Sequence, residues 1–175
     1  MKKMLWLLSS LTVIAGVCAA ALAYVNELTT EPIAAMQEKK ANAAAMAVMP
    51  PQAVKVEKKD SCFIGLDAGG KIVGYALEGV SGAGYGGDIA LMVGFEADRT
   101  TVVGYRALRA SETPGLGTKL STPEFSGQFA GKKTLKPIAV DKDGGEIESI
   151  TSATITSRAV CGAVNDAAKK LAAVK

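Results

Sequence analysis

The hydrophobic pattern begins with one long uninterrupted apolar run. Residues 4–24 contain no charged side chain, and at about 1.5 Å rise per residue a helix of that length crosses a hydrocarbon core of about 30 Å. Lys2 and Lys3 precede the run, and basic residues stay preferentially on the cytoplasmic side. We therefore predict a transmembrane anchor over residues 1–24, with a cytoplasmic N-terminus and an exported body.

A cleaved signal peptide is the alternative for the same segment. Ala21-Leu22-Ala23 is an acceptable cleavage site after a short basic region. A lipoprotein signal at Cys18 is excluded, because Val17 is too large for the position before an acylated cysteine. Both remaining interpretations export the body of the chain.

Residues 25–53 are alanine-rich and polar, which predicts a helical stalk. Thr30 can cap a helix that has Pro32 in its first turn, and Pro50-Pro51 would end it. The apolar side of this helix is narrow. It is either a spacer that lifts the domain from the membrane or a contact for a partner protein.

From residue 54 onward short β-rich runs alternate with glycine, which predicts an antiparallel meander. The candidate strands are residues 62–66, 72–77, 89–95 and 101–108. Residues 79–88 hold many glycines and are expected to form a long loop, either as a flexible connection or as backbone that approaches a flat ligand. The run lacks the Gly-Lys-Ser/Thr of a nucleotide P-loop.

In the second half of the body, the sequence pattern predicts two helices and one more strand. Residues 121–125 read as a short helix capped by Ser121 or Thr122, with Phe125 and Phe129 on one face. Residues 137–140 read as a strand. A final helix presents a core stripe at helical spacing, made of Val160, Val164, Ala167, Leu171 and Val174. The predicted fold class is α+β: a single transmembrane helix plus a domain, residues 54–175, with a mainly antiparallel sheet and flanking helices.

The amino-acid composition excludes several classes of function and of site. The chain has no histidine, which removes imidazole bases and histidine metal ligands. Its formal net charge is only +3, so no basic surface for nucleic acid is expected. Cys18, Cys62 and Cys161 are too widely spaced to build a metal site from this chain alone. Cys62 and Cys161 could form a disulfide in an exported domain or stay as buried thiols.

A cluster of hydroxyl side chains over residues 148–158 directly precedes the final helix. A helix N-terminus exposes unpaired N–H groups and favours a phosphate. The simpler interpretation is that Thr156 or Ser157 caps the helix.

Two motifs together resemble a known family. Glu112-Thr113-Pro114-Gly115-Leu116-Gly117 is followed by Thr151-Ser152-Ala153-Thr154-Ile155-Thr156, and this arrangement resembles the flavin-binding G subunit of Rnf-type electron-transport complexes and the related C subunit of the sodium-pumping NADH:quinone reductase. The resemblance implies that FMN is covalently bound by a phosphoester to Thr154. Glu148 stands where the family usually has Asp, and Ser152 where it usually has Gly.

The resemblance also implies which residues contact the cofactor. The threonine would be an attachment point and not a catalytic nucleophile, since a separate flavin transferase would activate it. Lys119 or Arg106 would place positive charge near the reduced ring. The implied cofactor-binding residues are Glu112, Thr113, Gly115, Leu116, Gly117, Thr118, Lys119, Thr151, Ser152, Ala153, Thr154 and Thr156.

The expected function is that of an electron carrier, and not of a self-sufficient enzyme, in a redox-driven ion-pumping complex. The resemblance implies as partners other membrane subunits, including a second flavin-carrying integral protein, and a flavin transferase for maturation. Three alternatives stay open: the corresponding component of the sodium-pumping reductase, a membrane-anchored binding or assembly module without redox chemistry, and a stand-alone anchored flavoprotein reductase.

Overall fold

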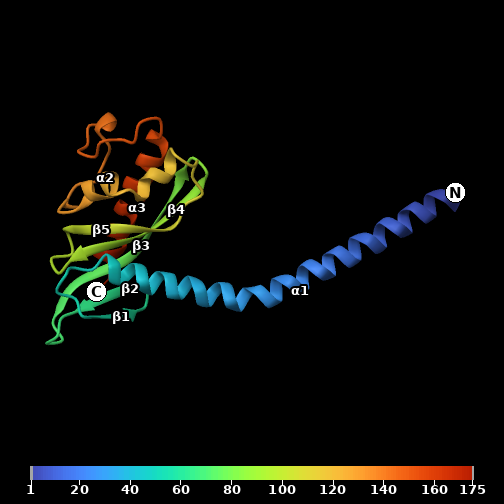
Figure 1. Cartoon of the computed structure of the whole chain (residues 1–175), viewed down its shortest axis with the longest axis horizontal. Helices are drawn as coiled ribbons and strands as arrows, with labels where there is room; N and C mark the ends of the chain where they lie inside the picture. The colour runs from blue at the N-terminus through green and yellow to red at the C-terminus, as the bar shows by residue number, and fades with distance from the viewer. Residues whose placement is uncertain (1, 175) are drawn as a thin grey trace. The chain divides into compact units, whose positions relative to one another are not determined.

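The computed structural model describes residues 2–174. They form two compact units whose boundary lies between Lys39 and Lys40. The unit from Lys40 onward holds the sheet, its covering helices and the candidate site. The fold is α+β, as predicted from the hydrophobic pattern (Figure 1).

Helix α1 runs without interruption from Lys2 to Ala47, with Pro32 inside it. The prediction that Thr30 starts a new helix is therefore wrong. The Thr30 hydroxyl donates to the Asn26 carbonyl at 2.6 Å, and that of Thr29 donates to the Val25 carbonyl at 2.8 Å. Such bonds to the preceding turn are typical of threonine inside a helix. In the described chain, Lys3–Ala47 is the helical stretch long and apolar enough to span a membrane.

Five strands form one antiparallel sheet in chain order, which confirms the predicted meander (Figure 1). Strand β1 was not predicted, because its sequence, Lys-Val-Glu-Lys-Lys, shows no run of apolar residues. The strands are β1 (Lys55–Lys59), β2 (Cys62–Leu66), β3 (Ile72–Gly84), β4 (Gly87–Glu96) and β5 (Val102–Arg109).

The expected glycine-rich loop over residues 79–88 is instead the end of a long β3–β4 hairpin. Gly79 pairs with Leu91, and the strands stay paired up to Gly84 and Gly87. The glycines serve close packing: a Cβ on Gly79 would lie 2.0 Å from the carbonyl oxygen of Ala163. The loop prediction failed because it took glycine as a sign of flexibility, whereas here a helix lies directly on the strand.

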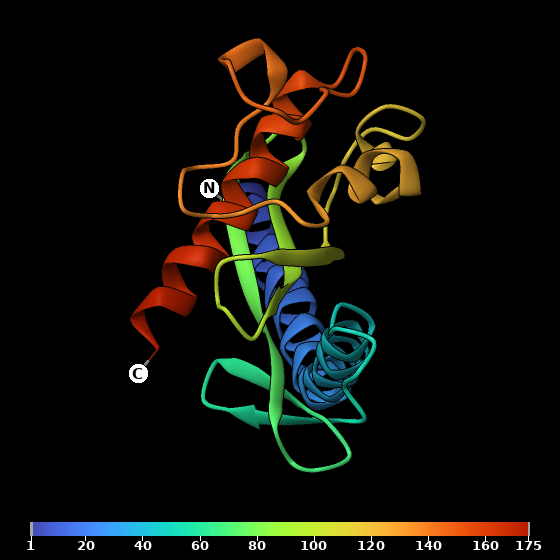
Figure 2. The same ribbon diagram turned by 90° about the vertical axis from the view of Figure 1, so that its left-hand side faces the viewer.

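Along the central strands β3 and β4, buried apolar side chains alternate between the two faces of the sheet. Leu77 and Leu91 face helix α3 (Thr154–Ala173), while Ala76 and Met92 face the other way. Figure 2 shows α3 (red) running beside the long green strands. The second face is covered by the last turns of α1 and the segment after it, through Ala45, Val48 and Met49.

Helix α3 confirms the predicted core stripe. Val160, Val164, Ala167 and Leu171 are fully buried against the sheet. Val174 follows the end of the helix and packs at the margin of the same core.

Short helical segments connect β5 to α3. These are η1 (Gly117–Ser121), α2 (Pro123–Ser126), η2 (Gly127–Phe129) and η3 (Asp141–Asp143). The rings of Phe125 and Phe129 lie 5.7 Å apart, which confirms their shared face. The predicted capping is wrong, because Thr122 occupies the N-cap position but its hydroxyl donates to the Lys119 carbonyl.

Two further predictions concern single segments. The predicted strand at 137–140 is wrong: only an isolated bridge pairs Val140 with Ile147. Cys62 and Cys161 are buried free thiols, so the disulfide alternative is not realised. Burial raises the pKa of the Cys161 thiol to about 12.

Candidate functional site

A cavity of about 490 Å³ lies where three chain segments meet. That volume is within the range of small-molecule sites, about 300–1,000 Å³. The tip of the β3–β4 hairpin, the segment after β5 and the start of α3 each supply part of the wall. The lining residues are Tyr85, Glu112, Thr113, Leu116, Gly117, Ser152, Ala153, Thr154, Ile155 and Thr156.

The two motifs singled out in the sequence therefore share one cavity. Four of the predicted residues, Gly115, Thr118, Lys119 and Thr151, are exposed and do not line it. The Gly115 N–H donates to the Thr118 hydroxyl at 3.0 Å, so these two residues hold the shape of the loop behind the wall.

Buried Glu112 joins the three segments. The Thr156 hydroxyl donates to its Oε2 at 2.7 Å, and the N–H of Gly86 donates to its Oε1 at 3.4 Å. A Cβ on Gly117 would lie 2.4 Å from the same Oε2. The expected close backbone approach thus occurs at Gly117, and it is made toward Glu112 and Thr156.

Helix α3 begins at Thr154, whereas a helix capped by Thr156 or Ser157 would begin after that capping residue. Thr156 and Ser157 are buried inside its first turns, and neither caps the helix. The Ser157 hydroxyl donates to the Ala153 carbonyl at 3.0 Å and accepts the Ile150 N–H at 2.9 Å. The N-cap position is Ala153, which has no polar side chain, so the N–H groups of the first turn are left for another acceptor.

Thr154 is half-buried in that first turn and lines the cavity. Lys142 donates to the Thr154 hydroxyl, with Nζ 2.9 Å from Oγ1. The ammonium group and the helix N-terminus together favour an anion at this place. Sequence reasoning missed Lys142, because nothing in the pattern brings the 141–143 turn back to the start of α3.

The residues on either side of Lys142 hold the turn in place. Arg158 donates two bonds of 2.7 Å to Asp143, and this ion pair lowers the pKa of the Asp143 carboxyl. Asp141 accepts the Ser149 N–H at 3.1 Å, and bonding to Ser149 lowers the pKa of that carboxyl as well. Both contacts bind the turn to the segment that carries the hydroxyl cluster.

Ser152 adopts a left-handed backbone conformation, with φ of 64°. This region suits glycine and is unfavourable for a side chain with a Cβ. The position is the one where the motif of the resembled family usually has glycine.

Tyr85 and Ile155 also line the cavity and were not predicted. Tyr85 is 72% exposed at the hairpin tip, and Ile155 is 50% exposed in the first turn of α3. Large apolar side chains left exposed beside a cavity offer contact area to a flat ligand. An aromatic residue inside a glycine run was the signal that could have identified Tyr85.

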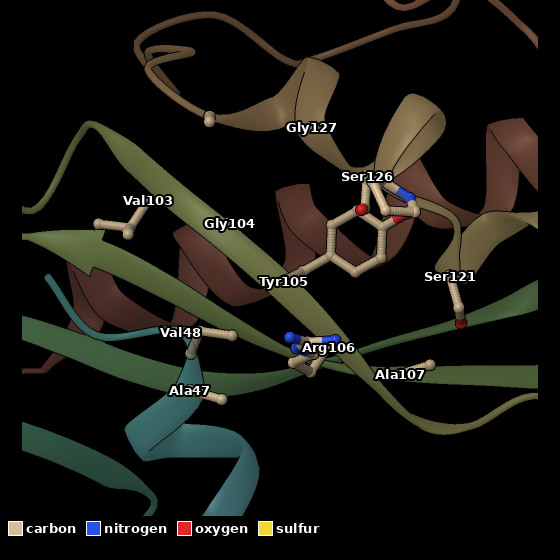
Figure 3. Close-up of a pocket in the computed structure, with 12 residues that line it drawn as sticks. Ala47, Val48, Val103, Gly104, Tyr105, Arg106, Ala107, Ser121, Ser126 and Gly127 are labelled. Carbon is tan, nitrogen blue, oxygen red and sulfur yellow. The ribbon is translucent and has the colours of Figure 1, made fainter. Parts of the chain in front are cut away.

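Arg106, suggested above as a cation near a ring, lies elsewhere. It lines a different cavity of about 440 Å³ between β5 and the short helices, together with Val103, Tyr105, Ser121 and Ser126 (Figure 3). The two cavities share no lining residue. The suggested role of Arg106 as a cation beside the candidate site is therefore wrong.

Comparison with known proteins agrees with this geometry. The FMN-binding domain family matches residues 84–169, a range that includes the whole candidate site. The structural resemblance extends to crystal structures of the C component of Na(+)-translocating NADH-quinone reductase. The protein from Parabacteroides distasonis has a TM-score of 0.54 at 29% identity, over 65% of this chain and 63% of that one. NqrC from Shewanella oneidensis shares the fold, with a TM-score of 0.52 at 22% identity over 74% of this chain and 73% of that one.

Curated relatives match almost the full length of the chain. The G subunit of the ion-translocating oxidoreductase complex of Methanosarcina acetivorans is 32% identical, over 90% of this chain and 89% of its own. The G subunit of the Na(+)-translocating ferredoxin:NAD(+) oxidoreductase complex of Acetobacterium woodii is 33% identical, over 89% of this chain and 85% of its own. With both motifs in one cavity and this coverage, the chain belongs to the family of G subunits of Rnf-type ion-translocating oxidoreductase complexes.

Proposed function

We propose that the chain carries FMN through a phosphoester to Thr154 and relays electrons within a membrane-bound, ion-translocating complex. The observation that carries this proposal is the position of Thr154. It lies in the first turn of a long helix and lines the cavity that unites both motifs.

The residues present fit such a group. Leu116 and Tyr85 supply apolar surface for a flat ring, and Gly117 lets the wall pack closely on Glu112 and Thr156. The helix N-terminus and Lys142 compensate phosphate charge near Thr154. Bound FMN would supply the capacity to accept and donate electrons one or two at a time. The chain holds it in place, and a covalent tether keeps it at high effective concentration in an exported domain.

The anchor, the side of the membrane and the partners belong to the same proposal. Residues 1–24 span the membrane with the N-terminus in the cytoplasm, and the domain lies on the outer side. The electrons pass to and from other membrane subunits, one of which carries a second flavin, and a flavin transferase attaches the cofactor. The relatives are themselves named as subunits of ion-translocating oxidoreductase complexes, which supports this assignment.

Thr154→Ala tests the attachment point, with Thr151→Ala and Thr156→Ala as matched controls. Each full-length variant is coexpressed with a flavin transferase and run on a denaturing gel, where only covalent flavin stays fluorescent with the protein. We expect Thr154→Ala alone to lose the fluorescence, because the other two hydroxyls are not the proposed acceptor.

Persistent fluorescence in Thr154→Ala would overturn the attachment point. A colourless wild-type protein, purified after coexpression, would instead favour a membrane-anchored binding or assembly module. A circular dichroism spectrum of Thr154→Ala equal to that of the wild type shows that the variant is folded.

A further inference from the structure

We propose that Lys142 is a positioning residue for flavin attachment: it orients the Thr154 hydroxyl for the incoming phosphate and compensates the charge of the phosphoester once formed. This inference rests on the proposed function. Its direct support is the 2.9 Å bond from Lys142 Nζ to Thr154 Oγ1, between residues twelve positions apart in the chain.

The Lys142 side chain comes from a turn with little freedom. Segment η3 is closed by backbone bonds from Asp143 to Val140 and from Gly144 to Asp141, at 2.9 and 3.0 Å. Gly144 takes the left-handed conformation that ends the turn, with φ of 79°. The turn is further bound to the start of α3 by the Asp143–Arg158 pair. The fold therefore fixes the backbone of Lys142 opposite the start of α3, and its exposed side chain reaches Thr154 from there.

No carboxylate forms an ion pair with Lys142 among the described residues. The carboxylate of Asp143 is engaged by Arg158, and that of Asp141 accepts the Ser149 N–H, although the charge of Lys142 also helps to lower the pKa of Asp141. The only polar side-chain contact that the structure gives Lys142, within the described residues, is the Thr154 hydroxyl. Arg158, the other cation nearby, is committed to its carboxylate partner.

The direction of the bond suits the reaction. An ammonium group only donates, so it occupies a lone pair of the Thr154 oxygen and leaves the hydroxyl proton free for a base of the transferase. The Thr154 oxygen forms a bond to the flavin-side phosphorus of FAD while the bond from that phosphorus to AMP breaks. AMP leaves with the electron pair, the hydroxyl proton goes to the base, and nothing is oxidised or reduced. The ester product keeps one negative charge, which Lys142 compensates.

The test is a time course of attachment to the purified full-length protein in detergent, with FAD and a flavin transferase. Lys142→Met keeps the length of the side chain without its charge, and Lys142→Arg restores the charge. Lys136→Met is the control, because Lys136 is exposed and does not line the site. In-gel fluorescence and the mass of the intact protein report attachment, and a melting temperature reports folding.

We expect Lys142→Met to load about tenfold more slowly, corresponding to the loss of one charge-assisted hydrogen bond. Lys142→Arg should recover most of the rate, Lys136→Met should load as the wild type does, and all melting temperatures should agree. Loading of Lys142→Met at the wild-type rate would overturn the inference. So would a slow rate that comes with a lower melting temperature and is not rescued by arginine, because Lys142 would then be merely structural.

Thr154→Ala in the same assay separates this inference from the proposed function. If that variant stays unlabelled while Lys142→Met loads normally, the attachment point stands and the role of Lys142 is wrong. If Thr154→Ala is labelled like the wild type, the attachment point itself is wrong, and the inference that depends on it is overturned too.

Discussion

At the scale of single residues, the backbone at Ser152 is the least relaxed feature of the site. Its φ of 64° costs a residue with a Cβ about 1 kcal/mol relative to glycine. The conformation turns the chain into the first turn of α3, immediately before Ala153 and the half-buried Thr154. The strain is thus located beside the hydroxyl proposed to accept the cofactor.

Ser152→Gly should therefore stabilise the domain, by about 0.5–1 kcal/mol in the free energy of unfolding. The loss of strain outweighs the greater freedom of glycine in the unfolded chain. Chemical denaturation of the full-length protein measures the change. Ser152→Ala is the control, because it removes the hydroxyl but keeps the Cβ. An equal gain in both variants would mean that the hydroxyl, and not the backbone conformation, is unfavourable.

The Asp143–Arg158 pair makes a prediction about pH. The pKa of Asp143 is lowered in the folded protein, so its carboxylate stabilises the fold above the ordinary pKa of 3.8. This contribution is lost as the pH falls through the folded-state pKa. Asp143→Asn should unfold more easily than the wild type near neutral pH, and the difference should vanish in strong acid.

Denaturation curves across the acid range measure this difference. Arg158→Gln removes the same pair from the other side and should show the same pH dependence, while the double variant should add nothing further. A difference between wild type and Asp143→Asn that stays constant down to strong acid would show that the pair does not contribute through its charge.

At the scale of elements, the contact between β3 and α3 depends on Gly79. A Cβ there would lie 2.0 Å from a carbonyl oxygen and 2.9 Å from the Ala167 side chain. Gly79→Ala should force the helix away from the strand and destabilise the domain by roughly 1–3 kcal/mol. Gly127→Ala is the matched control, because its Cβ would meet nothing within 4 Å and its φ is −64°. Equal melting temperatures for the two variants would contradict this packing.

The elements that could be predicted from sequence are those with a marked apolar pattern. The helical stripe from Val160 to Leu171 and the apolar runs at 62–66 and 89–95, which contribute to both faces of the sheet, have such a pattern. Strand β1 does not, because it forms an exposed edge with lysines and only one apolar residue. Residues 79–84 were misjudged because a glycine needed for helix contact looks, in sequence, like a glycine needed for a turn.

The candidate site was predictable as far as its two motifs, and less so beyond them. Glu112 and Thr154 were found through the resemblance, and the structure places both motifs at one cavity. The Glu112–Thr156 bond, and with it the true role of Thr156, depends on two segments meeting in space. Lys142 and Tyr85 come from segments that the motifs do not include, so only the fold brings them to the site.

At the scale of the whole molecule, the end of α1 belongs to the folded domain. Ala45, Val48 and Met49 are buried against Phe63 and Met92. A chain that begins at Lys40 should therefore have the same free energy of unfolding as the full-length protein. A chain that begins at residue 54 lacks these buried side chains, so its free energy of unfolding should be several kcal/mol lower.

Urea denaturation of both shortened chains measures the difference. The chain that begins at Lys40 serves as the control for removal of the apolar segment itself. Equal stability of the two would show that residues 40–53 contribute nothing to the core. It would also support the predicted domain boundary at residue 54.

Under the proposed attachment at Thr154, the contact between Lys142 and Thr154 would also set an order of events in maturation. The two residues meet only after the turn at 141–143 has closed and α3 has packed on the sheet. A nascent or unfolded chain would present the threonine motif without its cation, and so would be a poor acceptor. Folding would therefore come first and the proposed attachment last, so that only copies that had already reached their native state would receive the flavin.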